Sequence, residues 1–411
     1  MTRTPSPINR REFVRRSVHT GLAAGFLAGA ARGYAAHDTI RVAVLGSGGR
    51  ARQLMAPLRR LPNVRIVAVC DIWEHALQEG LKLAEPDAVA YRDYREALDH
   101  KDCDAVLIGS PDHWHVPMAA DACAAGKDVY VEKPLTHSLD EGARIIDAQN
   151  RHQRIVQVGQ QQRSMTHLRR AYDEIVRPGK LGRVHQVRIW WNRNGYGLSS
   201  TRPAFGVDPK TLDWKAFCGS APAQPFDEYR FRQWRWFWDF GGGILTDLMT
   251  HFIDVVHWYM DTEGPQAASA SGGLYFCGQK WETPDTINVL LTYPDKRSVV
   301  FHGTFSNGYG GAGIEFQGSQ ATLYVDRGRY ELHPIDAAAR PDVVVSDELP
   351  KGTDLTRDYQ DETHLRNWIE CMRSRQKPVC PAEVGVSAAA ASHMGNIAYR
   401  TGKVFTRPAA R

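Results

Sequence analysis

The sequence contains few cysteines and no closely spaced pair of them. Its 411 residues include seven cysteines, and no two have the C-x-x-C spacing. This absence argues against a disulfide framework and against a cysteine-based zinc site. We expect each cysteine to be a small buried apolar residue, in a chain that folds under reducing conditions. The seven are Cys70, Cys103, Cys123, Cys218, Cys277, Cys371 and Cys380.

An excess of charge of one sign is missing from all but the first 36 residues. The chain has 51 Lys and Arg against 46 Asp and Glu, and residues 1–36 hold six Arg and one Glu of these. The remainder carries 45 basic and 45 acidic residues, and its Lys and Arg form no cluster with interleaved aromatics. A nucleic-acid partner is therefore not expected. The sequence also lacks internal repeats and long low-complexity stretches.

Residues 1–36 have the three parts of a bacterial signal peptide. The basic region contains Arg10 and Arg11, with Phe13 two residues on, which matches the twin-arginine pattern. The apolar run "VHTGLAAGFLAGAA" is too short, and too rich in Gly and Ala, for a comfortable membrane span. "GYAA" then offers cleavage near Ala35 or Ala36. We expect the twin-arginine machinery to export the folded protein to the periplasm; a basic tail or an attached helix is the alternative.

The residues after the leader exceed what one hydrophobic core usually serves, so we expect two domains, at 37–160 and 161–411. In the first domain, apolar runs alternate with helical patterns, which predicts a doubly wound parallel sheet of the α/β class. The expected strands lie at 39–45, 64–71, 103–111, 127–134 and 154–160, and the helices at 47–61, 75–84, 115–126 and 138–152.

The second domain has longer runs with period-two alternation, which predict antiparallel strands. An aromatic-rich segment, 227–243, overlaps the start of a helical pattern at 241–260. We expect most of its aromatic side chains in the core or in a subunit interface rather than against a sugar. The expected strands lie at 182–194, 266–276, 285–295, 297–305 and 312–333, and further helices at 361–375 and 382–402.

The stretch "VAVLGSGGRA" has the pattern of a dinucleotide-binding loop. Gly46, Gly48 and Ala51 occupy G-x-G-x-x-G/A between a predicted strand and a predicted helix. Asp71 follows at the end of the second strand, where a carboxylate can bind the adenosine ribose and repel a 2′-phosphate. The pattern predicts NAD rather than NADP, although Arg50 could accommodate that phosphate. A loop that merely needs glycine is the alternative. Ser47 and Gly49 complete the predicted cofactor loop.

The motif "SPDHWH" follows another predicted strand. Ser110 and Pro111 then lie at the carboxyl edge, where open parallel sheets bind ligands. His113 and His115 could be metal ligands at i and i+2. We expect them instead to be loop residues that border the cofactor, because no nearby Cys or carboxylate pattern completes a metal site. No metal is predicted.

The stretch "VYVEKPL" places Glu132, Lys133 and Pro134 at the end of a further strand. A residue before proline is pushed out of helical conformation, so Lys133 would project from a turn. Beside a positively charged nicotinamide its pKa would fall, and it could exchange protons with a substrate hydroxyl. A surface lysine paired with Glu132 is an equally weighted alternative.

The helix "GGGILTDLMTHFIDVVHW" carries two acids and two histidines in an apolar setting. Asp247 and His251 are four residues apart and share a helix face, as a general base and its carboxylate partner would. Asp254 and His257 lie on the same or neighbouring turns. A core helix with satisfied polar groups is the alternative, but burying these four residues is costly. We therefore expect a site.

Together these motifs resemble the Gfo/Idh/MocA oxidoreductases, because "GSGGRA", "SPDHWH", "EKP", "VGQQQR" and "GGGILTDLMTH" occur in that family's order. The resemblance implies a Rossmann domain, a second α/β domain whose open sheet often mediates homo-oligomers, and C-terminal helices that return towards the first domain. It also implies hydride exchange with a carbohydrate or polyol.

Residue roles carry over from the family at matching positions. The resemblance implies His251 as general base, Asp247 as its partner or a substrate ligand, and Lys133 as the group that orients substrate and shares its proton. Gln160 would contact the cofactor and Arg163 the substrate. Met249 replaces the glycine of the family's usual D-x-G-x-H, which leaves the acid–base pair but changes the pocket.

An exported nicotinamide enzyme has no soluble cofactor pool, so it must keep NAD bound and restore it within each cycle. Exchange between two sugars would close the cycle. Redox-neutral glycoside hydrolysis, through oxidation at C3, elimination, water addition and reduction, would also close it. A glycoside 3-dehydrogenase that passes electrons to another acceptor is a third variant. A non-catalytic binding protein should have lost Lys133 or His251, and both are present. Metal-dependent hydrolysis is a weaker rival.

Overall fold

The first sheet of the computed structural model has six parallel strands in the order β3-β2-β1-β4-β5-β6. The structure describes residues 38–194, 202–336, 340–345 and 355–408, so the predicted signal peptide lies outside the described residues. The strands are β1 Ile40–Leu45, β2 Val64–Cys70, β3 Val89–Tyr91, β4 Ala105–Ile108, β5 Asp128–Val131 and β6 Val156–Val158.

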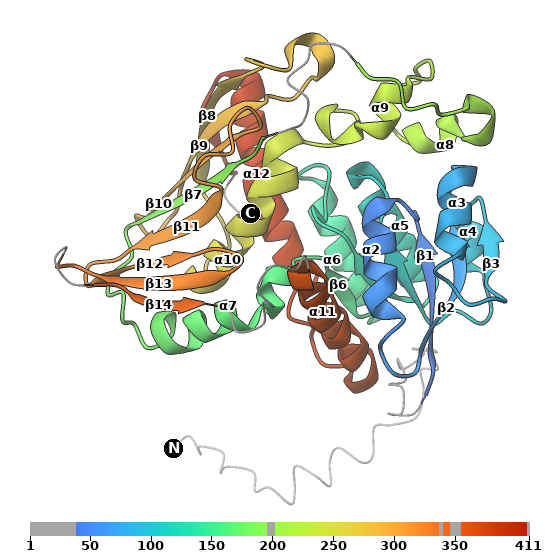
Figure 1. Cartoon of the computed structure of the whole chain (residues 1–411), viewed down its shortest axis with the longest axis horizontal. Coiled ribbons are helices and arrows are strands. Elements are labelled where there is room, and N and C mark those ends of the chain that lie inside the picture. Colours follow the sequence, from blue (N-terminus) through green and yellow to red (C-terminus); the bar gives the residue numbers. More distant parts are fainter. Residues whose placement is uncertain (1–37, 195–201, 337–339, 346–354, 409–411) are drawn as a thin grey trace, which may run out of the picture. The chain divides into compact units, whose positions relative to one another are not determined.

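Helices cover both faces of this sheet, as the alternating pattern predicted (Figure 1). Apolar residues of α2, α3 and the C-terminal α11 pack on one face, and those of α4, α5 and α6 pack on the other. The short β3 and α4 were not predicted. The helices are α2 Gly49–Leu58, α3 Glu74–Leu81, α4 Tyr94–Leu98, α5 Asp112–Ala124, α6 Glu141–His152 and α11 Leu355–Ser374.

The second sheet has nine strands in the order β14-β13-β12-β11-β7-β10-β9-β8-β15. Neighbouring strands are antiparallel except β7 and β10, which are parallel. Residues alternate between buried and accessible along β9 and β10, so one face forms a core and the other is open. The strands are β7 Gln186–Asn192, β8 Ala267–Gly273, β9 Thr286–Thr292, β10 Ser298–Thr304, β11 Ala312–Gln317, β12 Ala321–Val325, β13 Arg329–Pro334, β14 Asp342–Val345 and β15 Phe405–Thr406.

Helices α10, Thr250–Met260, and α12, Ala382–Thr401, pack on the core face of the second sheet. The apolar pattern of the predicted 241–260 helix explains why most of its residues are buried, but Leu245–Met249 is a π turn rather than an α-helix. The remaining short elements are α7 Thr166–Ala171, α8 Trp214–Cys218, α9 Glu228–Arg232, a π turn at Tyr172–Val176, and 3-10 turns at Gln161–Ser164, Pro209–Thr211, Trp234–Trp236 and Gly278–Lys280.

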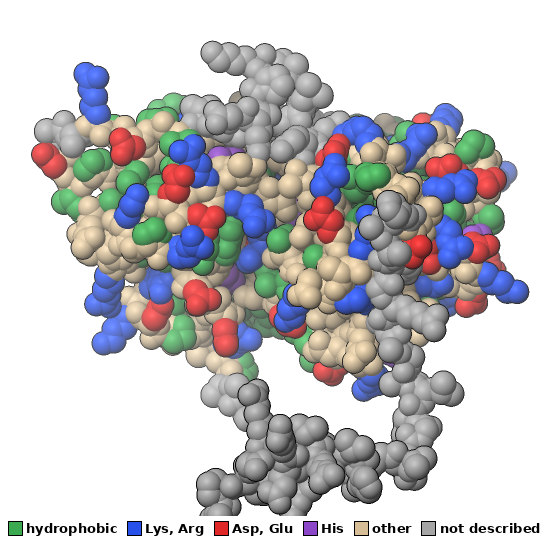
Figure 2. All heavy atoms as spheres, turned by 90° about the horizontal axis from the view of Figure 1, so that it is seen from below, with side chains coloured by type: hydrophobic (Ala, Val, Ile, Leu, Met, Phe, Trp, Pro, Cys, Tyr) green, Lys and Arg blue, Asp and Glu red, His purple; other side chains and the backbone are tan. Residues whose placement is uncertain are grey.

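The cysteines and the charged side chains lie where the sequence predicted them. All seven cysteines are buried and unpaired. On the face shown in Figure 2, basic and acidic side chains are interspersed. Across the described ranges, no helix is long and apolar enough to cross a membrane.

Candidate active site

A cavity of about 1230 Å³ opens at the carboxyl edge of the parallel sheet. This edge is the switch point of the fold, because β1 is followed by β2 on one side and is paired with β4 on the other. Residues at the ends of β1, β2, β4 and β5 line one wall, and the π turn and residues 231–236 line the other. The volume exceeds that of a usual small-ligand pocket and suits a dinucleotide together with a substrate.

The glycine loop provides an open cradle at the start of α2. Gly46 has a φ of +79°, and a Cβ there would stand 2.8 Å from the backbone nitrogen of Ser110. At Gly48 and Gly49, by contrast, no atom lies within 4 Å of the position of a Cβ. The first turn of α2 therefore faces open space with no side-chain cap, as pyrophosphate binding requires. The loop fits the predicted dinucleotide.

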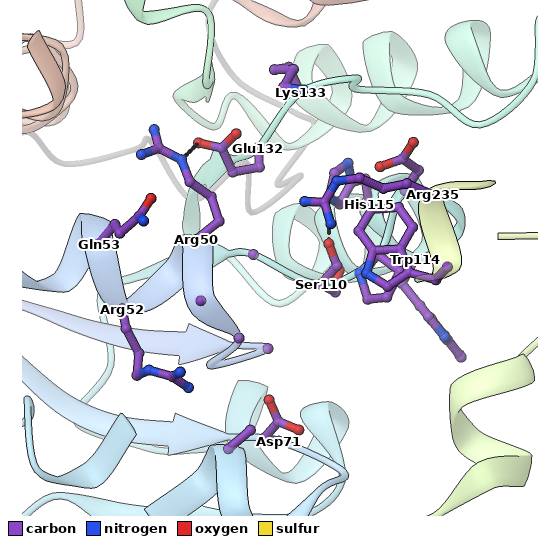
Figure 3. Close-up of a pocket in the computed structure, with 18 of the residues that line it drawn as sticks. Arg50, Arg52, Gln53, Asp71, Ser110, Trp114, His115, Glu132, Lys133 and Arg235 are labelled. Atoms are coloured by element: carbon purple, nitrogen blue, oxygen red, sulfur yellow. Dashed lines mark hydrogen bonds and ion pairs between the residues drawn. The ribbon is translucent and has the colours of Figure 1, made fainter. Parts of the chain in front are cut away.

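Asp71 lines the cavity and lies on the opposite side of the view from Lys133 in Figure 3. One carboxylate oxygen accepts hydrogen bonds from the backbone N–H of Ser47 at 2.8 Å and from its Oγ at 3.3 Å. The other accepts from the backbone N–H of Trp73 at 2.9 Å. Burial raises the pKa of Asp71. These contacts hold the carboxylate beside the glycine loop, where a ribose diol would lie.

Arg50 does not face Asp71. Its Nε lies 3.0 Å from Glu132, and its two terminal nitrogens donate to Asp361 at 2.6 and 2.8 Å. Figure 3 shows its guanidinium directed toward Glu132, whereas Arg52 lies nearer Asp71. The expected accommodation of a 2′-phosphate by Arg50 is therefore not supported, because both carboxylates hold its side chain elsewhere.

The two histidines of "SPDHWH" lie on a helix, which corrects the expected loop. Pro111 takes an extended conformation as the N-cap, and α5 starts at Asp112. His115 lines the cavity, with its ring between the carbonyls of Ser110 and Pro134 at 2.9 and 2.7 Å. Burial lowers the pKa of this imidazole to about 4.

His113 is held against the second domain rather than at the cofactor. Its Nε2 lies 2.7 Å from the carbonyl of Phe217, and the residue does not line the cavity in the part of the chain that the structure describes. Burial lowers its pKa to about 4. Within the same described part, no group of three His, Cys, Asp or Glu side chains is placed to hold a metal ion.

Lys133 and Asp247 meet across the two domains. The Nζ of Lys133 donates to the carbonyl of Asp247 at 2.6 Å and lies 3.1 Å from its carboxylate. The Nε of Arg235 donates to the same carboxylate at 3.3 Å. Burial alone would raise the pKa of Asp247, but the charges of Lys133 and Arg235 hold it well below its ordinary value. Asp247 is therefore ionised at neutral pH.

His251 lines the same end of the cavity and is neutral. Its side chain is 8% exposed, and its ring lies 5.7 Å from that of Trp191. Burial, with the nearby charges of Lys133 and Arg327, lowers its pKa well below 6.5. Among the described residues its Nδ1 has no hydrogen-bond partner. A neutral, unpartnered imidazole at a cavity wall can accept a proton.

The predicted direct pairing of Asp247 with His251 is wrong. The carboxylate of Asp247 is bound to Lys133 and Arg235 instead. The physical reason is the π turn at Leu245–Met249, where Thr250 Oγ1 donates to the carbonyl of Leu245, five residues earlier. The wider turn changes the angular offset on which the i, i+4 argument depended.

Four other residues of the predicted site bind partners outside the cavity. Arg163 binds Asp254 at 2.8 and 2.9 Å in the core, and His257 lies 2.9 Å from the hydroxyl of Tyr293. Gln160 donates to the carbonyl of Thr250 at 3.3 Å. Of the described residues that line the cavity, none is Gln160, Arg163, Asp254 or His257.

Several cavity residues were not predicted. "VGQQQR" pointed to the right stretch, but Gln161 and Gln162 line the cavity instead of Gln160 and Arg163. Asp112 belongs to the "SPDHWH" motif, but no role was predicted for it. Asp361 on α11 carries no local signal. Arg235 belongs to the aromatic-rich segment, whose Phe237 and Phe240 are buried in the core as expected, whereas Phe231, Trp234 and the buried Trp236 line the cavity.

Residues 202–240 of the second domain, here called the crossing segment, lie over the Asp71 end of the cavity. Figure 1 shows α8 and α9 of this segment on the side of α3 and α5. The backbone N–H of Asp213 donates to the carbonyl of Ile72 at 3.1 Å, and Leu212 forms a β-bridge with Trp73. The ring of Phe231 packs edge-on against Trp73 at 5.3 Å. The segment therefore ties the two domains together beside the predicted ribose site.

The fold and the cavity define a two-domain dinucleotide-binding protein. Two family models match the chain: "Oxidoreductase family, NAD-binding Rossmann fold" over residues 40–160 and "GFO/IDH/MocA C-terminal domain" over residues 216–324. Together they span more than half of the chain, which belongs to the Gfo/Idh/MocA family of NAD-binding oxidoreductases.

The chain is similar to the uncharacterized oxidoreductase YrbE of Bacillus subtilis, with 24% identity over 84% of this chain and 90% of that protein. It is 33% identical to an alpha-N-acetylgalactosaminidase of Shewanella oneidensis over 125 residues, which cover 28% of this chain and 27% of that enzyme. Levoglucosan dehydrogenase in complex with NADH has the same fold, with a TM-score of 0.70 and 14% identity over 90% of this chain and 100% of the other.

Proposed function

We propose that the chain is an NAD-dependent oxidoreductase that acts on a carbohydrate or polyol hydroxyl and keeps its cofactor bound through the catalytic cycle. The observation that carries the proposal is the convergence of Lys133, Asp247 and His251 at one end of the cavity, with the glycine loop and Asp71 at the other. The name of levoglucosan dehydrogenase supports a sugar substrate.

Each residue at the catalytic end has a distinct role. NAD, when bound, supplies the acceptor for a hydride. His251, buried and neutral, accepts the proton of the hydroxyl that is oxidised. Lys133 has three N–H donors, of which Asp247 takes two through its carbonyl and carboxylate. The third orients a substrate oxygen, and Asp247 with Arg235 fixes the ammonium group in place.

The crossing segment supports cofactor retention. For bound NAD to leave from the Asp71 end, the contacts of Trp73 with Leu212 and Phe231 would have to open. Such a slow release suits an enzyme that is exported with its cofactor, as the predicted leader implies. Export remains part of the proposal. Replacement of Arg10 and Arg11 by lysine should leave the protein in the cytoplasm, as judged by immunoblots of cell fractions.

Redox-neutral glycoside cleavage is a second candidate, favoured by the similarity to the alpha-N-acetylgalactosaminidase. In this cycle the C3 hydroxyl is oxidised, and the C2 proton then becomes acidic. Loss of that proton expels the group at C1, water adds to the resulting double bond, and the C3 ketone is reduced again. His251 and Lys133 would serve the proton transfers.

The test uses the mature protein purified without added nucleotide. We expect denaturation to release about one NAD(H) per chain, and 4-nitrophenyl glycosides and paired sugars then distinguish cleavage from exchange. Lys133→Ala and His251→Ala should lose turnover and retain NAD(H). The exposed Lys82 and His185 provide matched controls, Lys82→Ala and His185→Ala. Full turnover in both active-site variants would overturn the roles proposed for Lys133 and His251. A protein that is purified without NAD and binds it weakly would overturn the proposal that the cofactor stays bound through the catalytic cycle.

The open face of the nine-stranded sheet suits a homo-oligomer, which we also propose. Trp190 on β7 is partly exposed and stacks on Tyr324 and His302, with ring centroids 5.9 and 6.4 Å apart. Aromatic side chains at the centre of a sheet face favour burial against a partner. Sedimentation velocity should show an oligomer that Trp190→Arg dissociates, and a monomeric wild type would contradict this.

A further inference from the structure

We propose that Asp112 is a further catalytic residue whose carboxyl group contacts the substrate and donates a hydrogen bond to one of its oxygens. The inference rests on the proposed function and deepens it, because it adds a second polar group to the reacting end of the cavity. It was not among the residues that the sequence motifs singled out.

The position of Asp112 follows from the topology. Strand β4 ends at Ile108, Pro111 caps the following helix, and Asp112 is the first residue of α5, which has thirteen residues. The side chain thus lies at the carboxyl edge of a central strand, next to the switch point. Asp112 is 4% exposed and lines the cavity together with Lys133, Arg235 and Asp247.

Asp112 is a buried carboxyl group of this cavity without an ion pair or hydrogen bond in the part of the chain that the structure describes, unlike the neighbouring carboxylates Asp71, Glu132, Asp247 and Asp361. Asp71 accepts from two backbone N–H groups, Glu132 and Asp361 are bound by Arg50, and Asp247 is bound by Lys133 and Arg235. Within the described residues, burial and neighbouring charges act on the carboxyl group of Asp112 and no hydrogen bond does, and its oxygens are not among the fully enclosed side-chain atoms without a partner, so they face the cavity. Buried polar groups are almost always hydrogen-bonded. A buried carboxyl group that is unpartnered and faces a cavity is one that a ligand completes.

The surroundings of Asp112 decide its protonation state. Lys133 and Arg235 favour the ionised form, but burial, which is the largest effect, and the charges of Asp247 and Glu132 together outweigh them. The pKa of Asp112 is raised to about 8, so the group carries its proton at neutral pH. Asp247, across the same space, is held ionised. Two carboxyl groups with pKa values pushed apart have different roles: one accepts hydrogen bonds and the other donates.

With this assignment, three residues at the reacting end of the cavity have different roles. His251 takes the proton of the hydroxyl that is oxidised, and Lys133 orients that oxygen. Asp112 donates to a neighbouring substrate oxygen and retains its own proton, so no covalent step passes through it. A site that is built to bind an oxygen strongly rejects the analogue without it, because the protein group is then left unpaired. Asp112 is therefore also a specificity determinant.

The test compares Asp112→Asn, which keeps a neutral donor of the same shape, with Asp112→Ala, which removes it. Asp121→Asn is the matched control, because Asp121 is on the same helix and its side chain binds the hydroxyl of Tyr94. NAD(H) content, thermal unfolding and the pH profile of kcat/KM are measured for each. Loss of a buried hydrogen bond to a substrate oxygen that does not react costs about 10-fold to 100-fold in kcat/KM.

We expect Asp112→Ala to lose about that factor, and Asp112→Asn to lose clearly less. The wild-type profile should fall above about pH 8, and Asp112→Asn should lack that limb. All variants should retain NAD(H). An unaffected Asp112→Ala overturns the proposal. Equal loss in the two variants overturns hydrogen-bond donation, and loss of NAD(H) in both shows a cofactor contact instead.

Failure of the proposed function is separable from failure of this inference. If the wild type binds sugars without turning them over, calorimetry of the NAD-loaded proteins with myo-inositol, D-glucose and N-acetyl-D-galactosamine still tests Asp112. Weaker binding by Asp112→Ala than by Asp112→Asn supports the contact, and equal binding overturns it. A wild type that binds none of the three overturns both proposals.

Discussion

Replacement of Asp112 by asparagine should change how the stability of the protein depends on pH. The ordinary pKa of this carboxyl group, 3.8, applies in the unfolded chain, and burial raises it to about 8 in the fold. Between these values the folded state holds a proton that the unfolded state releases. Folding therefore takes up a proton, and the wild type becomes less stable as the pH rises.

The magnitude follows from the shift. Each pH unit between the two pKa values costs the wild type about 1.4 kcal/mol relative to a variant that has no proton to lose. Between pH 5 and pH 7 the free energy of unfolding of the wild type should therefore fall by about 2–3 kcal/mol relative to Asp112→Asn. Below the unfolded pKa, and above the folded pKa of about 8, the difference should be constant.

Urea unfolding of both proteins at several pH values measures this difference. Every sample contains the same concentration of NAD, and the Kd of each protein for NAD is measured at each pH so that the contribution of cofactor binding can be subtracted. The amide that Asp112→Asn introduces has its own desolvation cost, but that cost does not vary with pH, so only the slope is compared. Asp121→Asn, measured in parallel, controls for the loss of a carboxyl group elsewhere on the same helix. Parallel pH profiles for the wild type and Asp112→Asn would refute the raised pKa.

The other predictions concern the cofactor end of the cavity. Gly46→Ala should lower the unfolding free energy by about 1–3 kcal/mol, because φ is +79° and a Cβ would lie 2.8 Å from a backbone atom. Gly48→Ala should fold normally, because no atom lies within 4 Å of the Cβ position. Both variants should lose NAD in an equilibrium binding assay, and equal stability of the two would contradict the geometry. Phe231→Ala should speed the exchange of bound NAD for isotopically labelled NAD about 2-fold to 10-fold, because its ring contributes about 0.5–1.5 kcal/mol against Trp73. An unchanged exchange rate would exclude the crossing segment from cofactor retention.

Most of the fold could be predicted because its signals are local. Buried runs such as "VAVL" before Gly46 and "AVLIG" before Ser110 have no polar face, so they indicate a parallel sheet covered on both sides. The alternation along β9 and β10 indicates a sheet with one open face. The parallel pairing of β7 with β10 could not be predicted, because 105 residues separate Asn192 from Ser298 and strand order leaves no mark on local periodicity.

The site was predicted less completely than the fold, for three physical reasons. The i, i+4 argument for Asp247 and His251 assumed a regular α-helix, and the π turn removed that assumption. Asp361 reaches Arg50 from a helix about 300 residues away in sequence, so only the tertiary fold shows the contact. Arg163 has the chemistry of a substrate ligand, but its charge is neutralised by Asp254 in the core. Residue type alone does not distinguish these two environments.

The pair of Lys133 and Asp247 links catalysis to the assembly of the two domains. Lys133 follows β5 of the Rossmann sheet, and Asp247 belongs to the helix that packs on the second sheet. Both side chains are largely buried, so removal of Asp247 leaves the charge of Lys133 without its partner, and removal of Lys133 leaves Asp247 with Arg235 alone. The two residues that orient the substrate thus also hold the domains in register. For this reason, loss of turnover in Lys133→Ala shows a catalytic role of Lys133 only when the variant still retains its NAD.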